Sequence, residues 1–120
     1  VDLDAEFGAS LWKLAAEQHL ASAAGALGQL YERGEGVETN VTTAVSWYKK
    51  CAYEDQQCAF NYGYALQVGE GTERSLSRAI EWYNRAADLG ESRALYRLGT
   101  IYIGKEGGSY GISAKDCTRI

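Results

Sequence analysis

Apolar side chains recur at helical spacing early in the chain. Four of them are separated by four, three and one positions: Ala23, Leu27, Leu30 and Tyr31. This spacing places them on one stripe of a helix with 3.6 residues per turn. The sequence Gly34-Glu35-Gly36 follows directly, and glycine disfavours helix continuation because it loses much backbone entropy and readily adopts positive φ. The pattern therefore predicts a helix that ends at a glycine turn.

A second helix is expected after this turn. Asn40 lies four residues past Gly36, and Ser75 holds the same place after Gly71. Both are good N-cap residues, because their side-chain oxygens can accept a hydrogen bond from a free N–H of the first turn. Helical spacing then resumes at Ala44, Trp47, Tyr48, Cys51 and Ala52. Two helices joined by a short turn form a hairpin, so the predicted fold class is all-α.

The hairpin pattern repeats with a period of 35 to 36 residues. The first-helix segment is recognisable at residues 27–36, 62–71 and, less perfectly, 98–107. The second-helix segment is found at residues 44–52 and 79–87. One hairpin alone cannot bury both of its faces, so repeats of this size are expected to stack as a solenoid.

These copies predict four segments. Residues 1–22 are a degenerate second helix of a preceding repeat, 23–57 and 58–93 are complete repeats, and 94–120 are a partial repeat. We expect the partial repeat to hold a first helix and an irregular tail from residue 105, either partly ordered or cut short. The sequence contains no methionine, so we expect a processed chain or a piece of a longer one.

Small and large residues alternate in a way that suggests how the hairpins pack. Gly28, Gly63 and Gly99 share one mid-helix position, where each costs roughly 1 kcal/mol relative to alanine. We interpret this as a helix crossing too close for a Cβ atom. Aromatic rings at positions 47, 48, 82 and 83 are expected to fill the wider spaces between hairpins.

Composition and charge exclude two classes of partner. The 120 residues carry 12 basic and 16 acidic side chains, giving a net charge of -4. No basic cluster is present to neutralise phosphates, so nucleic-acid binding is not expected. The stretch that comes nearest to a membrane span, residues 21–28, is far shorter than the roughly 20 apolar residues of a membrane-spanning helix. Membrane insertion is therefore not expected.

No arrangement of reactive side chains predicts an enzyme. The Gly-x-Gly turns at residues 34–36 and 69–71 follow helices, not strands, and lack the third glycine of a nucleotide-binding loop. The single histidine, His19, lies near a predicted helix end in the degenerate unit, so we expect it to be structural or exposed, and three dispersed cysteines lack zinc-site spacing. We therefore expect no catalytic residues, no metal and no cofactor.

The combined pattern resembles the Sel1-like repeat, a family related to the tetratricopeptide repeat. In the first unit the motif lies at Ala23, Leu27, Gly28, Tyr31, Gly34, Gly36, Val37, Asn40, Ala44, Trp47, Tyr48 and Ala52. In the second it lies at Gly63, Gly69, Gly71, Ser75, Ala79, Trp82, Tyr83, Ala86, Ala87 and Gly90. The chain departs from the motif at Leu66, Thr72 and Lys105. The resemblance implies a right-handed superhelix of stacked antiparallel hairpins over residues 8–107.

The resemblance also implies a function, a scaffold or adaptor that binds a protein or peptide partner without catalysis. By analogy with tetratricopeptide arrays, the concave face would be lined by first-helix residues that escape the motif: Gln29, Glu32, Arg33, Phe60, Tyr64, Gln67, Tyr96, Arg97 and Thr100. Phe60 and Tyr96 have an alternative place in the core. An alternative function is that of a docking or regulatory segment, with partners among other domains of the same parent chain, including an enzyme.

Two further features have alternative interpretations. Cys51 and Cys58 flank a chain reversal, and cysteine-rich Sel1-like proteins join neighbouring helices near this junction, so these residues form either a disulfide or two buried thiols. Asn40-Val41-Thr42 is a glycosylation sequon, but its asparagine is also the expected N-cap.

Overall fold

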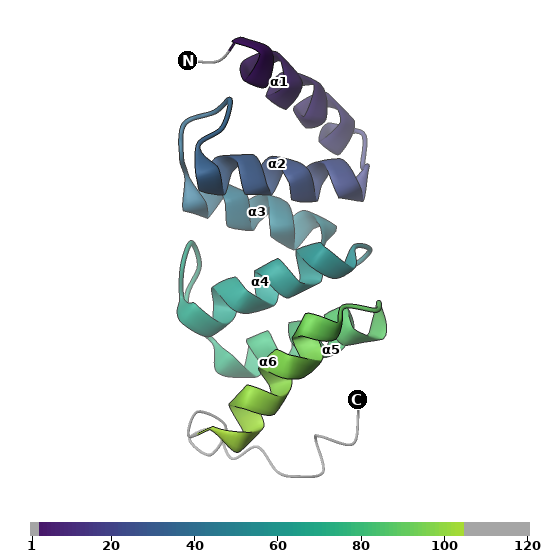
Figure 1. The fold of residues 1–120 in the computed structure, drawn as a ribbon, viewed down its shortest axis with the longest axis vertical. Coiled ribbons are helices and arrows are strands. Elements are labelled where there is room, and N and C mark those ends of the chain that lie inside the picture. The colour runs from purple at the N-terminus through teal and green to yellow at the C-terminus, as the bar shows by residue number, and fades with distance from the viewer. Residues whose placement is uncertain (1–2, 105–120) are drawn as a thin grey trace.

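The computed structural model describes residues 3–104, which form a stack of six α-helices (Figure 1). The helices are α1 (Leu3–Glu17), α2 (Ala21–Arg33), α3 (Val41–Cys51), α4 (Gln56–Val68), α5 (Leu76–Asp88) and α6 (Ser92–Ile103). Each packs on its neighbours in chain order, and the most extensive packing is within the hairpins α2/α3 and α4/α5. The predicted all-α class with stacked antiparallel hairpins is confirmed.

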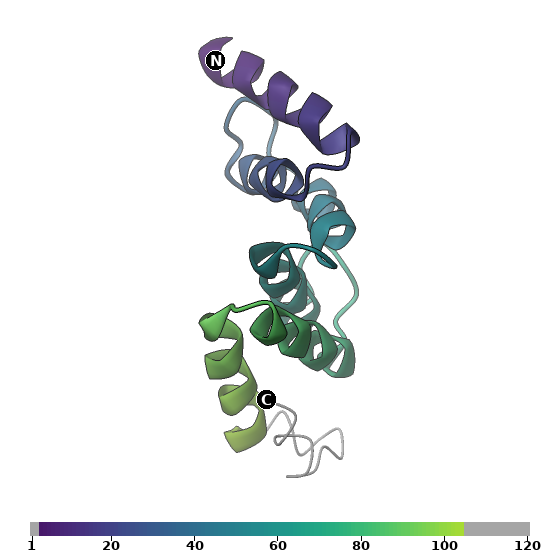
Figure 2. The ribbon, with the colours of Figure 1, turned by 90° about the vertical axis from the view of Figure 1, so that its right-hand side faces the viewer.

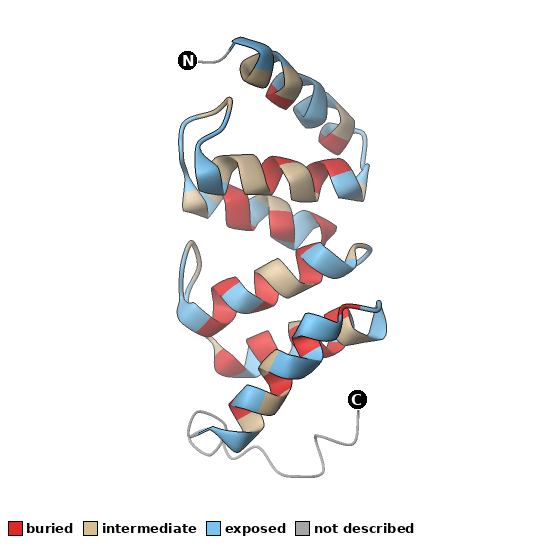
Figure 3. Cartoon of the chain, viewed as in Figure 1, coloured by how far each residue is buried: buried red, intermediate tan, exposed pale blue. Residues whose placement is uncertain are grey.

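The two helices of each hairpin lie on different sides of the stack. A view turned by 90° shows α2, α4 and α6 along one side and α3 and α5 along the other (Figure 2). Buried residues lie where the helices face one another, and exposed residues follow their outer surfaces (Figure 3). The first helices of the repeats therefore share one face of the molecule.

Side chains and glycines define where the helices begin and end. Asn40 and Ser75 accept hydrogen bonds from the N–H groups of Thr43 and Arg78, which confirms both predicted N-caps. The turns after α2 and α4 are confirmed as well, since their four glycines all have φ between 73° and 77°: Gly34, Gly36, Gly69 and Gly71. Positive φ of this kind is strained for residues that carry a Cβ.

The mid-helix glycines Gly28 and Gly63 face tyrosine rings of the following helix, and Gly63 also faces the backbone oxygen of Ala79 in α5. A Cβ atom added to Gly28 would lie 2.5 Å from the ring of Tyr48, and one added to Gly63 would lie 2.9 Å from the ring of Tyr83. The close approach expected at these glycines is therefore made by a tyrosine ring that packs against the helix. Tyr48 and Tyr83 therefore pack against the first helices of their own hairpins, and Tyr48 also lines a hollow with residues of α4 in the next hairpin. At Gly99, no atom of residues 3–104 lies within 4 Å of such an atom.

The remaining predictions on chain organisation fall partly beyond the described residues. The helix α6 occupies the first part of the predicted partial repeat, whereas the expected irregular tail, residues 105–120, lies outside the described residues. Among residues 3–104, no helix is both long enough and apolar enough to cross a membrane.

Candidate functional site

A polar hollow of about 250 Å³ opens beside α2 and α4, on the face shared by the first helices. Its lining comes from α2, α4 and the start of α6: Gln29, Glu32, Arg33, Gln57, Asn61 and Arg93. Three of the residues expected on the concave face, Gln29, Glu32 and Arg33, are therefore brought together here. We call this set of six residues, with Tyr64, the polar groove.

The charged side chains of the polar groove are paired within the chain. Arg33 lies 3.9 Å from the carboxylate of Glu35. Arg93 donates two hydrogen bonds of 2.9 Å to the carboxylate of Glu91, and these bonds hold the pKa of Glu91 below its usual value. Glu32 accepts a hydrogen bond from the hydroxyl of Tyr48. Burial and this contact raise the pKa of the Tyr48 phenol.

The amide side chains of the polar groove are unpaired. Gln29, Gln57 and Asn61 make no side-chain hydrogen bond with any residue in the 3–104 range. Gln57 is exposed, and Gln29 and Asn61 are half-buried. A primary amide carries two N–H donors and a carbonyl acceptor, so these three residues offer hydrogen-bonding groups of both kinds to a ligand.

Tyr64 extends the groove along α4. With Glu32 and Asn61 it lines a smaller adjoining hollow of about 70 Å³, and its ring remains 38% exposed. The guanidinium of Arg97 lies 4.9 Å from the ring centroid, a cation–π arrangement that joins α6 to α4. Two predicted residues, Tyr64 and Arg97, are thus in contact. Asn61 was missed by the sequence analysis, although it is one helical turn after Gln57 and three residues before Tyr64, both of which are exposed.

Other predicted concave-face residues have different surroundings. Gln67 is only 7% exposed, and its side-chain carbonyl accepts a hydrogen bond of 2.6 Å from Tyr83, so it supports the hairpin and is not open to a partner. Phe60 is half-buried between the ring of Tyr83 and the guanidinium of Arg93. Tyr96 and Thr100 are exposed on α6, Tyr96 by 75%.

Cys51 and Cys58 are joined by a disulfide in the structure, with their Cα atoms 5.7 Å apart. The bond links the end of α3 to the first turn of α4, and both residues are buried. The Sγ atom of Cys51 also lies 3.1 Å from the carbonyl oxygen of Trp47. A disulfide sulfur carries no hydrogen, so this is a contact and not a donated hydrogen bond.

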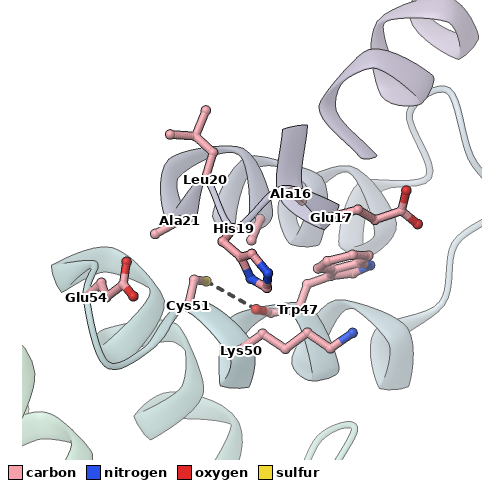
Figure 4. A pocket seen from close by; sticks show the side chains of 10 residues that line it. Ala16, Glu17, His19, Leu20, Ala21, Trp47, Lys50, Cys51 and Glu54 are labelled. Atoms are coloured by element: carbon pink, nitrogen blue, oxygen red, sulfur yellow. Dashed lines mark hydrogen bonds between the residues drawn. The ribbon is translucent and has the colours of Figure 1, made fainter. Parts of the chain in front are cut away.

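A second hollow, of about 430 Å³, lies where α1, α2 and α3 meet (Figure 4). Its wall includes the half-buried ring of Trp47 and small side chains of α1 and α2, namely Ala16, Ala21 and Ala24. Charged or polar side chains line it as well: Glu17, His19, Lys50 and Glu54. His19 precedes α2 in a left-handed conformation with φ of 68°, which is uncommon for a residue with a Cβ. We call this second hollow the Trp47 hollow.

Neither hollow contains a recognisable reactive centre. Across residues 3–104, no three of the histidine, cysteine, aspartate and glutamate side chains are arranged to hold a metal ion. The two hollows are lined instead by amides, paired charges and a partly exposed aromatic ring.

Comparisons with known proteins agree on one family. A family model described as the Sel1 repeat matches residues 21–55, 56–91 and 92–117. No curated protein sequence matches the chain significantly.

Solved structures with the same arrangement come from three bacteria. A Sel1 repeat protein from Oxalobacter formigenes is 36% identical, with a TM-score of 0.82 over 85% of this chain and 41% of its own. A protective antigen of uropathogenic Escherichia coli strains that displays an SLR fold is 30% identical, with a TM-score of 0.76 over 78% of this chain and 20% of its own. Helicobacter pylori cysteine-rich protein B is 26% identical, with a TM-score of 0.69 over 72% of this chain and 65% of its own. The chain thus spans less than two thirds of the length of each.

Proposed function

The chain belongs to the Sel1 repeat family, and we propose that it is a non-catalytic scaffold that binds a protein or peptide partner in the polar groove. Repeat proteins of this architecture generally mediate interactions through extended surfaces. The fold by itself does not specify a ligand, so the proposal rests on the groove residues.

The observation that carries the proposal is the set of unpaired amides. Gln29, Gln57 and Asn61 come from two neighbouring helices and line one hollow. An extended peptide presents alternating N–H and C=O groups, and primary amides can pair with both. The neighbouring charges are already paired within the chain, so main-chain hydrogen bonds are expected to contribute more than net charge. We therefore infer an extended peptide segment as the ligand.

Tyr64 supplies an anchor beside the amides. Its ring is partly exposed, and Arg97 holds it from one side. Tyrosine and arginine are enriched among the residues that dominate interface energies, because they bury a large area and keep a polar end for hydrogen bonding. A side chain of the bound peptide is expected to pack against this ring.

The proposal is tested with peptides selected from a random library against the immobilised protein. Affinities of the selected peptides are then measured by calorimetry for the wild type and for Asn61→Ala, Tyr64→Ala and Arg97→Ala. Each substitution is expected to weaken binding by about five- to fifty-fold, which corresponds to the loss of one hydrogen bond or one anchor contact. The melting temperature should change little, because these side chains are not part of the buried core.

A matched control is Gln18→Ala, which removes an exposed amide outside the polar groove. It should leave the affinity unchanged. The proposal is wrong if the control weakens binding as much as the groove variants do. It is also wrong if the groove variants bind normally, or if each of them lowers the melting temperature as much as a core substitution.

A further inference from the structure

In the second repeat, aromatic rings pack around the tryptophan that the first two repeats share. The ring of Trp82 lies edge-on to Tyr53, at 4.9 Å between centroids, and edge-on to Tyr62, at 5.3 Å. Tyr53 belongs to the loop between α3 and α4. Edge-to-face pairs of this kind are worth about 0.5–1.5 kcal/mol beyond the area they bury.

Tyr53 is held in place by the helix that carries Trp82. The guanidinium of Arg85 lies 5.3 Å from the Tyr53 ring centroid. Its nitrogen atoms also donate hydrogen bonds of 2.8 and 3.3 Å to the Tyr53 carbonyl oxygen. The loop residue, the tryptophan and the arginine thus form one packed group.

The first repeat has the same tryptophan but lacks the tyrosine. Thirty-five residues before Trp82 is Trp47, and the residue at the same distance before Tyr53 is Gln18. Gln18 is exposed and does not line the Trp47 hollow. In place of Arg85, Lys50 puts its ammonium group 4.4 Å from the Trp47 ring centroid. The Trp47 hollow therefore lies where the ring of Tyr53 lies in the following repeat.

We propose that the Trp47 hollow binds the aromatic side chain of a tyrosine or phenylalanine presented by a partner protein. Its volume of about 430 Å³ is ample for one ring, since an engineered apolar cavity of roughly 150 Å³ holds benzene. Ala16, Ala21, Ala24 and Trp47 supply the apolar contacts. This inference rests on the proposed function only in taking the ring from a protein partner.

The polar residues around the hollow suit an aromatic side chain. The ammonium of Lys50 contacts the Trp47 ring by a cation–π interaction, and Lys50 lines the same hollow. The carboxylates of Glu17 and Glu54 line the hollow and can accept a hydrogen bond from a tyrosine hydroxyl. A tyrosine is for this reason expected to bind more tightly than a phenylalanine.

The test uses nuclear magnetic resonance of the tryptophan indole N–H groups, with N-acetyltyrosinamide as the probe. In the ¹⁵N-labelled chain, the Trp47 signal should shift saturably, with a dissociation constant of about 1–10 mM for so small a ligand. The Trp82 signal is the internal control, and it should not move because Tyr53 already covers that ring. Absence of a saturable Trp47 shift up to the solubility limit of the probe would overturn the proposal.

A substitution that places a tyrosine of the chain itself in the Trp47 hollow tests the proposal without depending on how tightly the probe binds. Gln18→Tyr supplies the residue found at the equivalent place in the next repeat, so it should abolish the Trp47 shift and raise the melting temperature by several degrees. Gln18→Ala is the matched control and should do neither. If Gln18→Tyr leaves both the shift and the melting temperature unchanged, the proposal fails.

The outcome is separable from that of the polar groove. Asn61→Ala and Tyr64→Ala alter the groove but do not touch the residues that line the Trp47 hollow, so they should leave the titration unchanged. If they abolish the Trp47 shift, the probe is bound elsewhere and the assignment to this hollow is wrong.

Discussion

At Gly28 and Gly63 the lack of a side chain lets a tyrosine ring from the next helix lie against the helix backbone. The hydroxyl of each tyrosine then donates a hydrogen bond four positions further along the first helix, to Glu32 in one repeat and to Gln67 in the next. A glycine, a tyrosine twenty residues later and an acceptor therefore act together. This set of three residues explains why Gln67 is buried, although the sequence analysis placed it on the face expected to contact a partner.

The glycine positions should respond to alanine in opposite ways. Gly28→Ala places a Cβ atom 2.5 Å from the buried Tyr48 ring, so we expect a loss of about 1–3 kcal/mol in the free energy of unfolding. Gly99→Ala meets no atom of residues 3–104 within 4 Å, so the free energy of unfolding should increase by up to about 1 kcal/mol from helix propensity. Urea denaturation measures both. Equal effects of the two substitutions would contradict the packing described here.

The ion pair of Glu91 and Arg93 should make stability depend on pH. Hydrogen bonds from Arg93 hold the pKa of Glu91 below its usual value of 4.5, so the folded state favours the ionised carboxylate. Its contribution is therefore present above about pH 4.5 and is lost as the pH falls through the lowered value. In Glu91→Gln, the free energy of unfolding should decrease less between pH 7 and pH 3 than in the wild type.

The control for this pH dependence is Glu38→Gln. Glu38 is exposed and makes no side-chain hydrogen bond or ion pair within residues 3–104. Its substitution should leave the acid dependence as it is in the wild type. If Glu38→Gln flattens the dependence as much as Glu91→Gln does, the ion pair is not its source.

At the scale of elements, the first helices of the three repeats differ in how they begin. Asp55 caps α4 by accepting hydrogen bonds of 2.9 Å from the N–H groups of Gln57 and Cys58, and Glu91 caps α6. The corresponding residue before α2 is Leu20, whose side chain cannot accept a hydrogen bond. This departure is visible in the sequence once the repeats are aligned.

Replacing Leu20 with aspartate should therefore stabilise the chain. An N-cap acceptor is worth about 1 kcal/mol, so Leu20→Asp is expected to raise the free energy of unfolding by about that amount. The reciprocal substitution Asp55→Ala should lower it by about 0.5–2 kcal/mol. Thermal denaturation of both variants measures the pair. A destabilising Leu20→Asp would show that the leucine side chain has a packing role.

The link between α3 and α4 is open to a direct chemical test. With Cys51 and Cys58 bonded, alkylation before reduction should modify one cysteine of the three in each chain, and alkylation after reduction all three. Reduction should also lower the free energy of unfolding by about 2–3 kcal/mol, because the bond constrains a short loop of the unfolded chain. Modification of three cysteines without reductant would show that the thiols are free.

Periodicity predicted the elements well because each helix has its own pattern. The stripe at Ala23 and Leu27, the glycine turns and the caps at Asn40 and Ser75 are all local signals, and the structure contains each of them. The spacing of residues within one helix does not predict which residues of another helix they contact. For that reason Tyr48 and Tyr83 were assigned to spaces between hairpins, and their contacts with Gly28 and Gly63 inside their own hairpins were not foreseen.

At the scale of the whole molecule, each helix packs on its neighbours in the chain, as expected for a solenoid. On α1, the large apolar side chains of Leu3, Phe7 and Leu11 are each at least 49% exposed. On α6, Gly99 faces no tyrosine ring from the described part of the chain, unlike Gly28 and Gly63. The most extensive packing is within the hairpins α2/α3 and α4/α5, and the least extensive contact between consecutive helices is that of α3 with α4.

The candidate sites were predictable in part. The position of Gln29, Glu32, Arg33 and Tyr64 on one face follows from the repeat and from helical spacing, whereas Asn61 was overlooked. The sequence analysis missed the Trp47 hollow because the hollow lies beside a position where a tyrosine of the next repeat has no counterpart. Its signal was nonetheless present in the sequence, since Gln18 stands where the next repeat has Tyr53.

The central claim is that the α2, α4 and α6 side of the stack is an open surface for an extended peptide. The most direct measurement is the change in backbone amide chemical shifts when a library-selected peptide is added to the ¹⁵N-labelled chain. We predict that the largest changes map to α2, α4 and α6 around Gln29, Asn61 and Tyr64. Changes centred on α3 and α5 instead would contradict the claim.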